Sequence, residues 1–261
     1  MREPARRRPR GIPLRAVVPN AVTALALCFG LTGVRFAIAD EWERAVAAIV
    51  IAAVLDGMDG RIARMLNGSS RFGAELDSLS DVIAFGVSPA VIIYLWALQY
   101  FEKFGWIFAL AHAVCAALRL ARFNAAIDVE EQPHKSAGFL TGVPAPAGAG
   151  LALLPLYLWL WTGEELFRQP WLVAPWTALV AFLMISNLAT FSWTSLRLRS
   201  HVRLGALVVI ALVGGALFSA PWPTLSVAAI LYALLIPFSI ASYAKVKRQR
   251  RAAAGSAPHA P

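Results

Sequence analysis

Long apolar runs separated by short polar segments dominate the chain from Val17 to Ala244. Each run is close to the roughly 20 residues that a helix needs to cross the hydrocarbon core of a bilayer. The eight candidate spans are at roughly residues 17–38, 43–66, 73–99, 104–124, 146–162, 171–192, 203–219 and 224–243. The pattern predicts an all-α fold, namely a polytopic membrane helix bundle with about eight transmembrane helices and no second folded domain.

The two ends of the chain differ in composition from this apolar middle. Hydrophobic residues make up 59% of the chain and charged residues only 15%, against about 25% charged residues in an average soluble domain. The charged residues gather at the ends and in the short connections. We therefore expect a basic cytosolic tail at residues 1–16, a transmembrane domain at residues 17–244, and a second basic, disordered tail at residues 245–261.

The net charge of +9 comes from basic clusters between the apolar runs. Such clusters set membrane orientation and contact anionic lipid, so we expect membrane lipid and no nucleic acid as a partner. With a cytosolic N-terminus, 20 of the 24 Lys and Arg side chains fall on the cytosolic side. This asymmetry predicts a multi-pass protein of the cell (inner) membrane with both termini cytosolic.

Aromatic residues support the same orientation. Tryptophan is enriched where a helix meets the membrane surface. Seven tryptophans lie near the outer ends of the apolar runs, where we expect an interfacial belt: Trp42, Trp96, Trp106, Trp159, Trp161, Trp171 and Trp222. The longest polar connection, from Ala125 to Ala145, is expected on the inner side, either as a lid or as a solvated loop.

Four aspartates are concentrated at the junction of the second and third runs. Asp56 and Asp59 are three residues apart, and Asp77 and Asp81 are four apart. On helices, both spacings place the two carboxylates of a pair on one face. A turn around residues 67–70 brings the two helices together, so we expect all four carboxylates to converge near the cytosolic side of the membrane.

Four such anions cannot lie unpaired at membrane depth, because each costs at least a few kcal/mol there and they repel one another. Carboxylate oxygens are the ligands of hard divalent cations, so we expect two ions of Mg²⁺ or Mn²⁺. Intramembrane acids also occur along the ion pathway of a transporter. These four gather at one end of two adjacent helices, whereas a conduction path would extend across the membrane.

The segment DGMDGRIARMLNGSSRFGAELDSLSD, from Asp56 to Asp81, resembles the signature of the CDP-alcohol phosphatidyltransferase family. The pattern D-x2-D-G-x2-A-R-x8-G-x3-D-x3-D fixes eight positions over 26 residues, and all eight are met. The resemblance implies a helical catalytic core of about six spans, two metal ions, and a CDP-linked lipid as the donor substrate.

The resemblance also implies roles for individual residues. Metal ligands would be Asp56, Asp59, Asp77 and Asp81, and Asp81 would also be the general base. A Pro-Asn-x-x-Thr segment at the first span is frequent in the family. Taken alone, Asn20 and Thr23 of that segment read as a helix start and cap. With the family resemblance, the expected contacts to CDP-diacylglycerol are Asn20, Thr23, Gly60, Arg64, Ser70 and Gly73.

Segments outside the signature resemble the branch of the family that uses serine as the acceptor. They include Phe72–Ala90, Arg119–Asn124, Thr141–Ala147 and Ser186–Trp193. A guanidinium suits the carboxylate of serine, and an amide suits its amine or hydroxyl. We therefore expect Arg119, Arg122 and Asn124 to contact the acceptor, although the two arginines could instead only set topology.

The expected reaction is transfer of the phosphatidyl group from CDP-diacylglycerol to L-serine, giving phosphatidylserine and CMP. The serine hydroxyl would attack directly. Within the family, glycerol 3-phosphate, inositol or choline is the alternative acceptor, and a membrane transporter is the alternative from another class. The sequence leaves open whether the chain forms a homodimer.

Overall fold

The computed structural model describes residues 14–66, 68, 70–125, 139–186, 188–191 and 200–255. Three expectations fall wholly or partly outside these residues. They concern most of the tail at residues 1–16, the end of the tail at residues 245–261, and residues 126–138 of the long inner connection. Within the described part, the last helix continues to Gly255, so no helix ends at the expected boundary of residue 244.

The predicted all-helical architecture is confirmed. The elements in chain order are α1 (Leu14–Ile38), α2 (Trp42–Met65), α3 (Arg71–Asp81), a π-helix η1 (Val82–Val87), α4 (Ser88–Trp96), η2 (Leu98–Tyr100), α5 (Gly105–Ala125), β1 (Phe139–Thr141), α6 (Ala145–Ala152), α7 (Leu154–Thr162), η4 (Glu165–Arg168), α8 (Pro170–Ile185), β2 (Ala189–Phe191), α9 (Ser200–Ser219) and α10 (Pro221–Gly255). The sequence did not predict the short antiparallel pair, in which Phe139 of β1 lies opposite Phe191 of β2.

Four helical segments in the described part are long and apolar enough to cross a membrane: Val17–Ile38, Arg71–Trp96, Gly105–Ala125 and Pro221–Ser239. A fifth results if α6 and α7, which meet at a bend of 41°, are one broken span. Pro155 opens α7 and accounts for the break, because a proline cannot continue the hydrogen-bond ladder of the preceding helix. The chain is therefore a membrane protein, and the count of eight spans stays a prediction.

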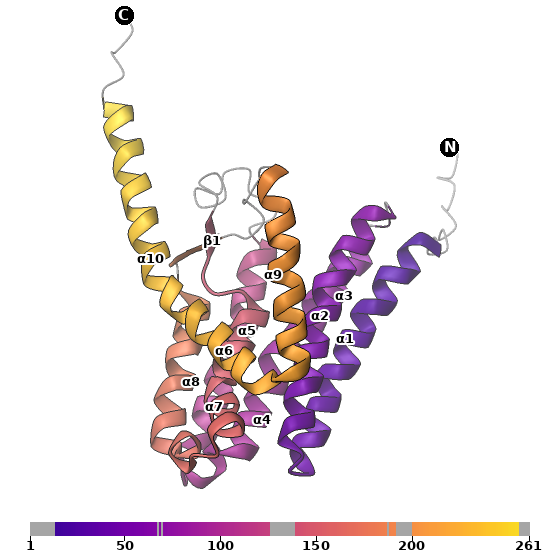
Figure 1. Ribbon diagram of the computed structural model, residues 1–261, viewed down its shortest axis with the longest axis vertical. Helices are drawn as coiled ribbons and strands as arrows, with labels where there is room; N and C mark the ends of the chain where they lie inside the picture. The colour runs from indigo at the N-terminus through magenta and orange to yellow at the C-terminus, as the bar shows by residue number, and fades with distance from the viewer. Residues whose placement is uncertain are drawn as a thin grey trace, which may run out of the picture.

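The helices form a bundle in which α1 and α2 pack side by side along their length (Figure 1). The described start of α1, the end of α2 and the end of α10 all lie at the same end of the bundle (Figure 1). The core lies between α4, α5, α7 and α8. Its largest fully buried side chains include Trp96, Ile92, Ile93, Leu156 and Met184.

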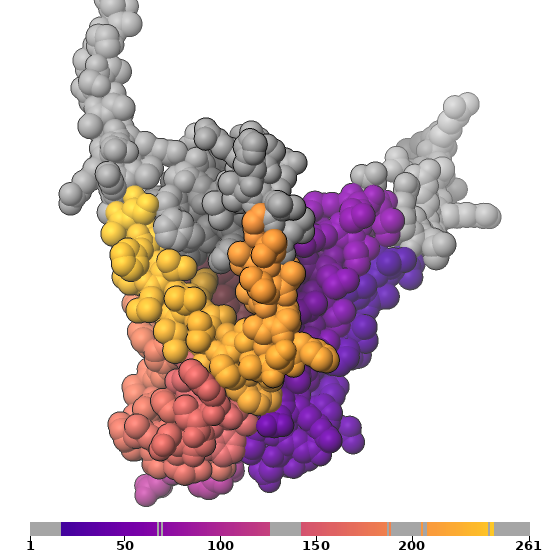
Figure 2. Space-filling view, viewed as in Figure 1, coloured from indigo at the N-terminus to yellow at the C-terminus, as the bar shows by residue number. Residues whose placement is uncertain are grey.

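The outer surface of the bundle is strongly apolar, as a bilayer requires. Along α9, Ile210 is 67% exposed and Phe218 is 93% exposed. Figure 2 shows α9 and the first half of α10 on the surface of the molecule, in orange and yellow, beside the indigo and purple helices α1–α3. Lipid chains, rather than other parts of this chain, are the natural neighbours of these side chains.

The expected tryptophan belt is wrong for two of its members. Trp96 is 0% exposed and Trp42 is 8% exposed, so both rings are covered by protein and neither is free to contact lipid headgroups. Trp96 ends α4 facing inward and stacks edge-on against Trp159, with 6.0 Å between ring centroids. Trp106 and Trp171 are exposed, as the belt requires. The sequence placed each tryptophan at a helix end but could not tell which face of the helix it occupies.

A half-buried arginine joins the connections at the end of the bundle opposite the termini. The Nε of Arg168 donates to the carbonyl of Trp96 at 3.0 Å. Its guanidinium carbon lies 5.7 Å from the ring centroid of Tyr100 and 5.6 Å from that of Trp159. The indole of Trp159 in turn donates to Glu165 at 3.1 Å. Arg168 therefore links η4 to the ends of α4 and α7.

We expect Arg168→Ala to destabilise the protein by about 1–3 kcal/mol, because the substitution leaves a buried carbonyl without its donor and removes two cation–π contacts. Thermal unfolding in detergent measures the change. Arg44→Ala is the matched control, since Arg44 makes only an exposed ion pair with Glu41 at 2.8 Å and such pairs contribute about 0–1 kcal/mol. Equal melting temperatures for the two variants would contradict the assignment.

Candidate active site

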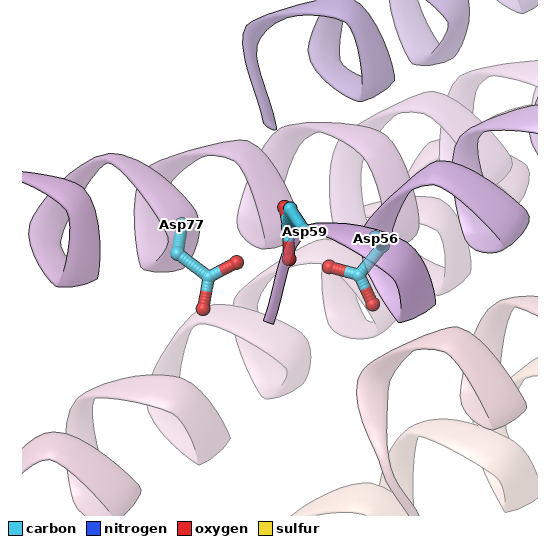
Figure 3. A group of neighbouring side chains, drawn as sticks. All are labelled: Asp56, Asp59 and Asp77. Atoms are coloured by element: carbon cyan, nitrogen blue, oxygen red, sulfur yellow. The ribbon is translucent and has the colours of Figure 1, made fainter. Parts of the chain in front are cut away.

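Three of the four predicted aspartates converge between α2 and α3. Asp56, Asp59 and Asp77 each offer one carboxylate oxygen, and these oxygens all lie within 4.8 Å of one another. Figure 3 shows the three side chains pointing toward a common space. Asp59 is only 5% exposed, and the other two are half-buried. The helical spacings of the sequence therefore place the carboxylates as predicted.

The return of the chain from α2 to α3 depends on Ser70 and Gly73. Ser70 is the N-cap of α3, and its hydroxyl accepts a hydrogen bond from the Gly73 N–H at 3.0 Å. A Cβ at Gly73 would lie 2.7 Å from the side-chain Oδ1 of Asn20, so a larger residue there would displace that side chain of the pocket wall. The packing of α3 on α1 and α2 brings Asp77 to Asp56 and Asp59.

Asp81 lies one turn beyond Asp77 and faces Asp56. The two carboxyl groups are close enough for a hydrogen bond when one of them carries a proton. Oδ1 of Asp81 is buried and has no hydrogen-bond partner among the described residues. A buried oxygen without a partner is costly. Asp81 lies outside the group of three clustered carboxylates and does not line the pocket described below, so Asp56 is its link to that group.

Thr23 of α1 holds one of the carboxylates. Its Oγ1 lies 2.6 Å from Oδ2 of Asp59 and 3.1 Å from the carbonyl of Pro19. The reading of this segment as a helix start is wrong, because α1 begins at Leu14 and Pro19 lies inside it. Ser80, which the sequence did not single out, donates to the carbonyl of Thr23 at 3.2 Å and joins α3 to the same point of α1.

A pocket of about 200 Å³ opens beside the carboxylates. All six residues predicted to contact the donor substrate line it, together with Asp59 and Asp77: Asn20, Thr23, Gly60, Arg64, Ser70 and Gly73. A Cβ at Gly60 would meet nothing within 4 Å, so this glycine leaves room in the pocket and is not needed for helix packing. Arg64 is exposed at the pocket wall and offers the positive charge that a phosphate requires.

The three residues predicted to contact the acceptor have different surroundings. Arg122 donates to the carbonyl oxygens of Ile185 and Ser186, at 2.8 and 3.3 Å, and so caps the end of α8. Asn124 donates to the hydroxyl of Ser78 at 2.9 Å, which joins α5 to α3.

Arg119 is the arginine that faces the carboxylates. Its guanidinium lies close enough to Asp81 and to Tyr232 of α10 for electrostatic interaction. Its Nε is buried without a hydrogen-bond partner among the described residues. Tyr232 could not have been found from the sequence, because it is an isolated polar residue within an apolar run.

The carboxylates fit a hard divalent cation. Oxygen ligands from Asp56, Asp59 and Asp77 within a few ångströms of one another are the arrangement that Mg²⁺ and Mn²⁺ prefer, and the partnerless oxygen of Asp81 adds a further candidate ligand beside them. The described residues place no Cys or His in this cluster, so zinc is not favoured. The cluster is therefore suited to a metal ion held by carboxylates.

Comparison with known proteins identifies the family. The CDP-alcohol phosphatidyltransferase profile matches residues 16–185, which include every residue of the site described above except Tyr232 and Ser186. The chain belongs to the CDP-alcohol phosphatidyltransferase family. A second profile, CDP-alcohol phosphatidyltransferase 2, matches residues 201–237. The phosphatidyltransferase assignment thus covers both the carboxylate helices and the α9–α10 pair.

Curated relatives match over most of this phosphatidyltransferase. A Mycobacterium tuberculosis protein is 38% identical over 233 residues, which cover 89% of this chain and 81% of the relative. A Mycobacterium leprae protein is 37% identical over 86% of this chain and 74% of the relative. A Helicobacter pylori protein is 32% identical over 82% of this chain and 86% of the relative. All three are named CDP-diacylglycerol–serine O-phosphatidyltransferase.

We expect Thr23→Val to weaken Mn²⁺ binding by about 10- to 100-fold, the usual effect of removing a group that orients a metal ligand. Titration followed by electron paramagnetic resonance measures this in purified protein. Thr177→Val is the matched control, because Thr177 is also buried and bonds only its own helix, through the carbonyl of Val173 at 2.8 Å. Equal affinity in the two variants would contradict the role of Thr23.

Proposed function

We propose that this enzyme transfers the phosphatidyl group from CDP-diacylglycerol to L-serine and releases phosphatidylserine and CMP. The observation that carries the proposal is the joint occurrence of a three-carboxylate cluster, two members of which line one pocket, and of relatives that match over most of the chain and are named for this reaction. Membership of the family makes the chain a transferase. The transporter alternative is thereby set aside.

The pocket between α1, α2 and α3 is proposed as the site of the CDP moiety. It lies at the end of α2, at the same end of the bundle as the described ends of α1 and α10 (Figure 1). Arg64 would pair with the diphosphate, and Gly60 would let the nucleotide approach the backbone. Asn20, Ser70 and Gly73 would complete this wall, while the acyl chains remain in the bilayer.

Asp56, Asp59, Asp77 and Asp81 are the residues that we propose hold two Mg²⁺ or Mn²⁺ ions. When bound, such ions neutralise the diphosphate and stabilise the negative charge that develops on the leaving CMP. The residues contribute in different ways. The hydroxyl of Thr23 fixes the orientation of Asp59, and the capped start of α3 fixes Asp77 opposite it.

Asp81 is proposed as the general base. It would accept the proton of the serine hydroxyl as that oxygen forms a bond to the phosphorus of the phosphatidyl group. The bond between this phosphorus and the oxygen of CMP breaks, and CMP leaves with that oxygen. The proton then passes from Asp81 to solvent. The place of Asp81, buried beside Asp56 at the edge of the carboxylate group, supports this role.

Arg119 is the residue that we favour as the partner of the serine carboxylate. It faces Asp81, where the acceptor hydroxyl must lie, and its Nε has no partner among the described residues. Arg122 and Asn124 are engaged at the end of α8 and on Ser78, so their predicted contact with serine would require them to share or exchange these bonds.

We further propose that the enzyme lies in the cell (inner) membrane with both termini in the cytosol. The uneven distribution of Lys and Arg between the connections on the two sides of the predicted spans supports this orientation. Soluble serine and CMP would then enter and leave from the cytosol, next to the carboxylates.

Purified enzyme given CDP-diacylglycerol and Mn²⁺ is expected to release CMP with L-serine, but not with inositol, choline or glycerol 3-phosphate. Chelation should abolish turnover reversibly. If the rate of CMP release does not depend on serine but rises with another alcohol, the serine proposal is wrong and the family assignment still holds.

Asp81→Asn is expected to lower kcat by about 10²–10⁴-fold, the usual contribution of a general base, while binding of CDP-diacylglycerol persists. Asp40→Asn is the control, since Asp40 is exposed at the opposite end of the bundle and has a φ of 58° that asparagine also tolerates. Near-normal turnover of Asp81→Asn would contradict the assignment of the base.

Arg119→Lys is expected to raise the KM for serine by about 10- to 100-fold, because it keeps the charge but loses the planar fork that pairs with a carboxylate. The KM for CDP-diacylglycerol should change little. The same measurement on Arg122→Lys separates the two arginines. A larger rise for Arg122→Lys would assign the carboxylate contact to Arg122 instead.

A further inference from the structure

A π-helical segment follows Asp81 directly. In η1 the N–H of Ser88 bonds to the carbonyl of Ile83, five residues earlier, instead of to the residue four earlier. Pro89, the residue after Ser88, accounts for this π-helical hydrogen bond. Pro89 has no N–H to offer the carbonyl of Phe85, and its ring would clash with that carbonyl in a regular α-helix. The chain widens by one residue and so avoids the clash.

A buried histidine donates a hydrogen bond to the carbonyl of Phe85, to which Pro89 cannot donate. His112 of α5 is 0% exposed, and its Nε2 lies 3.3 Å from the carbonyl oxygen of Phe85. Because this oxygen can only accept, Nε2 must carry the hydrogen. The other ring nitrogen, Nδ1, is buried without a partner among the described residues. Burying an imidazole with one ring nitrogen unbonded costs free energy that an apolar side chain would not. The hydrogen bond to Phe85 is therefore the feature that distinguishes His112 from an apolar core residue.

The segment is clamped from two sides. A Cβ at Gly30 of α1 would lie 2.7 Å from the Cα of Ala84. A Cβ at Gly86 would lie 2.9 Å from the Cβ of Ala116 on α5. The backbones of α1, η1 and α5 are therefore in close contact, and the bond from His112 adds one polar link between α5 and η1.

The register of η1 sets the direction of the carboxylates. One residue more or less in a helix turns everything beyond it by about 100°. The far side of η1 cannot turn, because Ile92, Ile93 and Trp96 of α4 are locked in the core at 0–1% exposure. A change in the register of η1 would therefore act on α3, which carries Asp77 and Asp81 and is held on α1 by the bond from Ser80 to the carbonyl of Thr23.

We propose that His112 is a positioning residue that holds η1 in its π-helical register and so aims Asp77 and Asp81 at Asp56 and Asp59. Its one hydrogen bond among the described residues goes to the backbone of η1 and not to a carboxylate. This role rests on the proposed function only in that the aimed carboxylates are those of the phosphatidyl transfer. The orientation of Asp77 and Asp81 is a property of α3, and Mn²⁺ binding reports on it without any turnover.

The test compares His112→Phe, which keeps a ring without a donor, with His112→Gln, whose side-chain amide can reach the same carbonyl. His112→Phe is expected to lower kcat by about 10- to 100-fold and to weaken Mn²⁺ binding by about tenfold, with little change in the KM for CDP-diacylglycerol. His112→Gln should restore most of both. Thr177→Val controls for the loss of a buried polar group away from η1.

A purely structural role for His112 predicts a lower melting temperature with normal kcat and Mn²⁺ affinity, and that result would overturn the proposal. Equal losses in His112→Phe and His112→Gln would overturn it as well. If His112→Phe does not fold, His112→Asn takes its place, because its amide is too short to reach Phe85. A wild-type enzyme inactive toward serine would refute the proposed acceptor, while the Mn²⁺ titration would still decide the role of His112.

Discussion

Repulsion among four carboxylates is the constraint on which the rest of this structure depends. Asp56, Asp59, Asp77 and Asp81 lie together at one end of the bundle, half-buried or buried. No ion pair within the described part of the chain involves any of the four, and Arg119 interacts electrostatically with Asp81 alone among them. Without a cation this arrangement would be strongly destabilising, so the scaffold must hold the carboxylates in place against their repulsion.

Contacts with α1 and with the segment after Asp81 hold the carboxylates in place against this repulsion. Thr23 donates to Asp59, Ser80 donates to the carbonyl of Thr23, and Gly73 allows α3 to lie against Asn20. Beyond α3, η1 leads into α4, whose residues Ile92, Ile93 and Trp96 are fully buried in the core. The site is therefore preorganised by backbone contacts and short hydrogen bonds rather than by attraction among its own residues, which suits a site that binds charged metal and diphosphate.

The sequence predicted the chemistry of the site more completely than the details of the bundle. Fixed spacing on helices sufficed to bring Asp56, Asp59 and Asp77 together, and the family resemblance supplied the six residues that line one pocket. Contacts that depend on three-dimensional packing could not be read from spacing. Periodicity within an apolar run does not reveal which face meets the protein, so Trp96 was placed at the membrane surface and is buried instead. The capping of α8 by Arg122 and the approach of Tyr232 to Arg119 join residues far apart in the chain.

Crystals grown with Mn²⁺ and measured at the manganese absorption edge test the central claim most directly. The account predicts two anomalous peaks among the carboxylates of Asp56, Asp59, Asp77 and Asp81, each within the distance of a direct metal–oxygen bond, about 2.0–2.6 Å. Loss of both peaks in Asp59→Asn would agree with it. Ordered aspartates with no peak between them, in protein that is active with Mn²⁺, would contradict it.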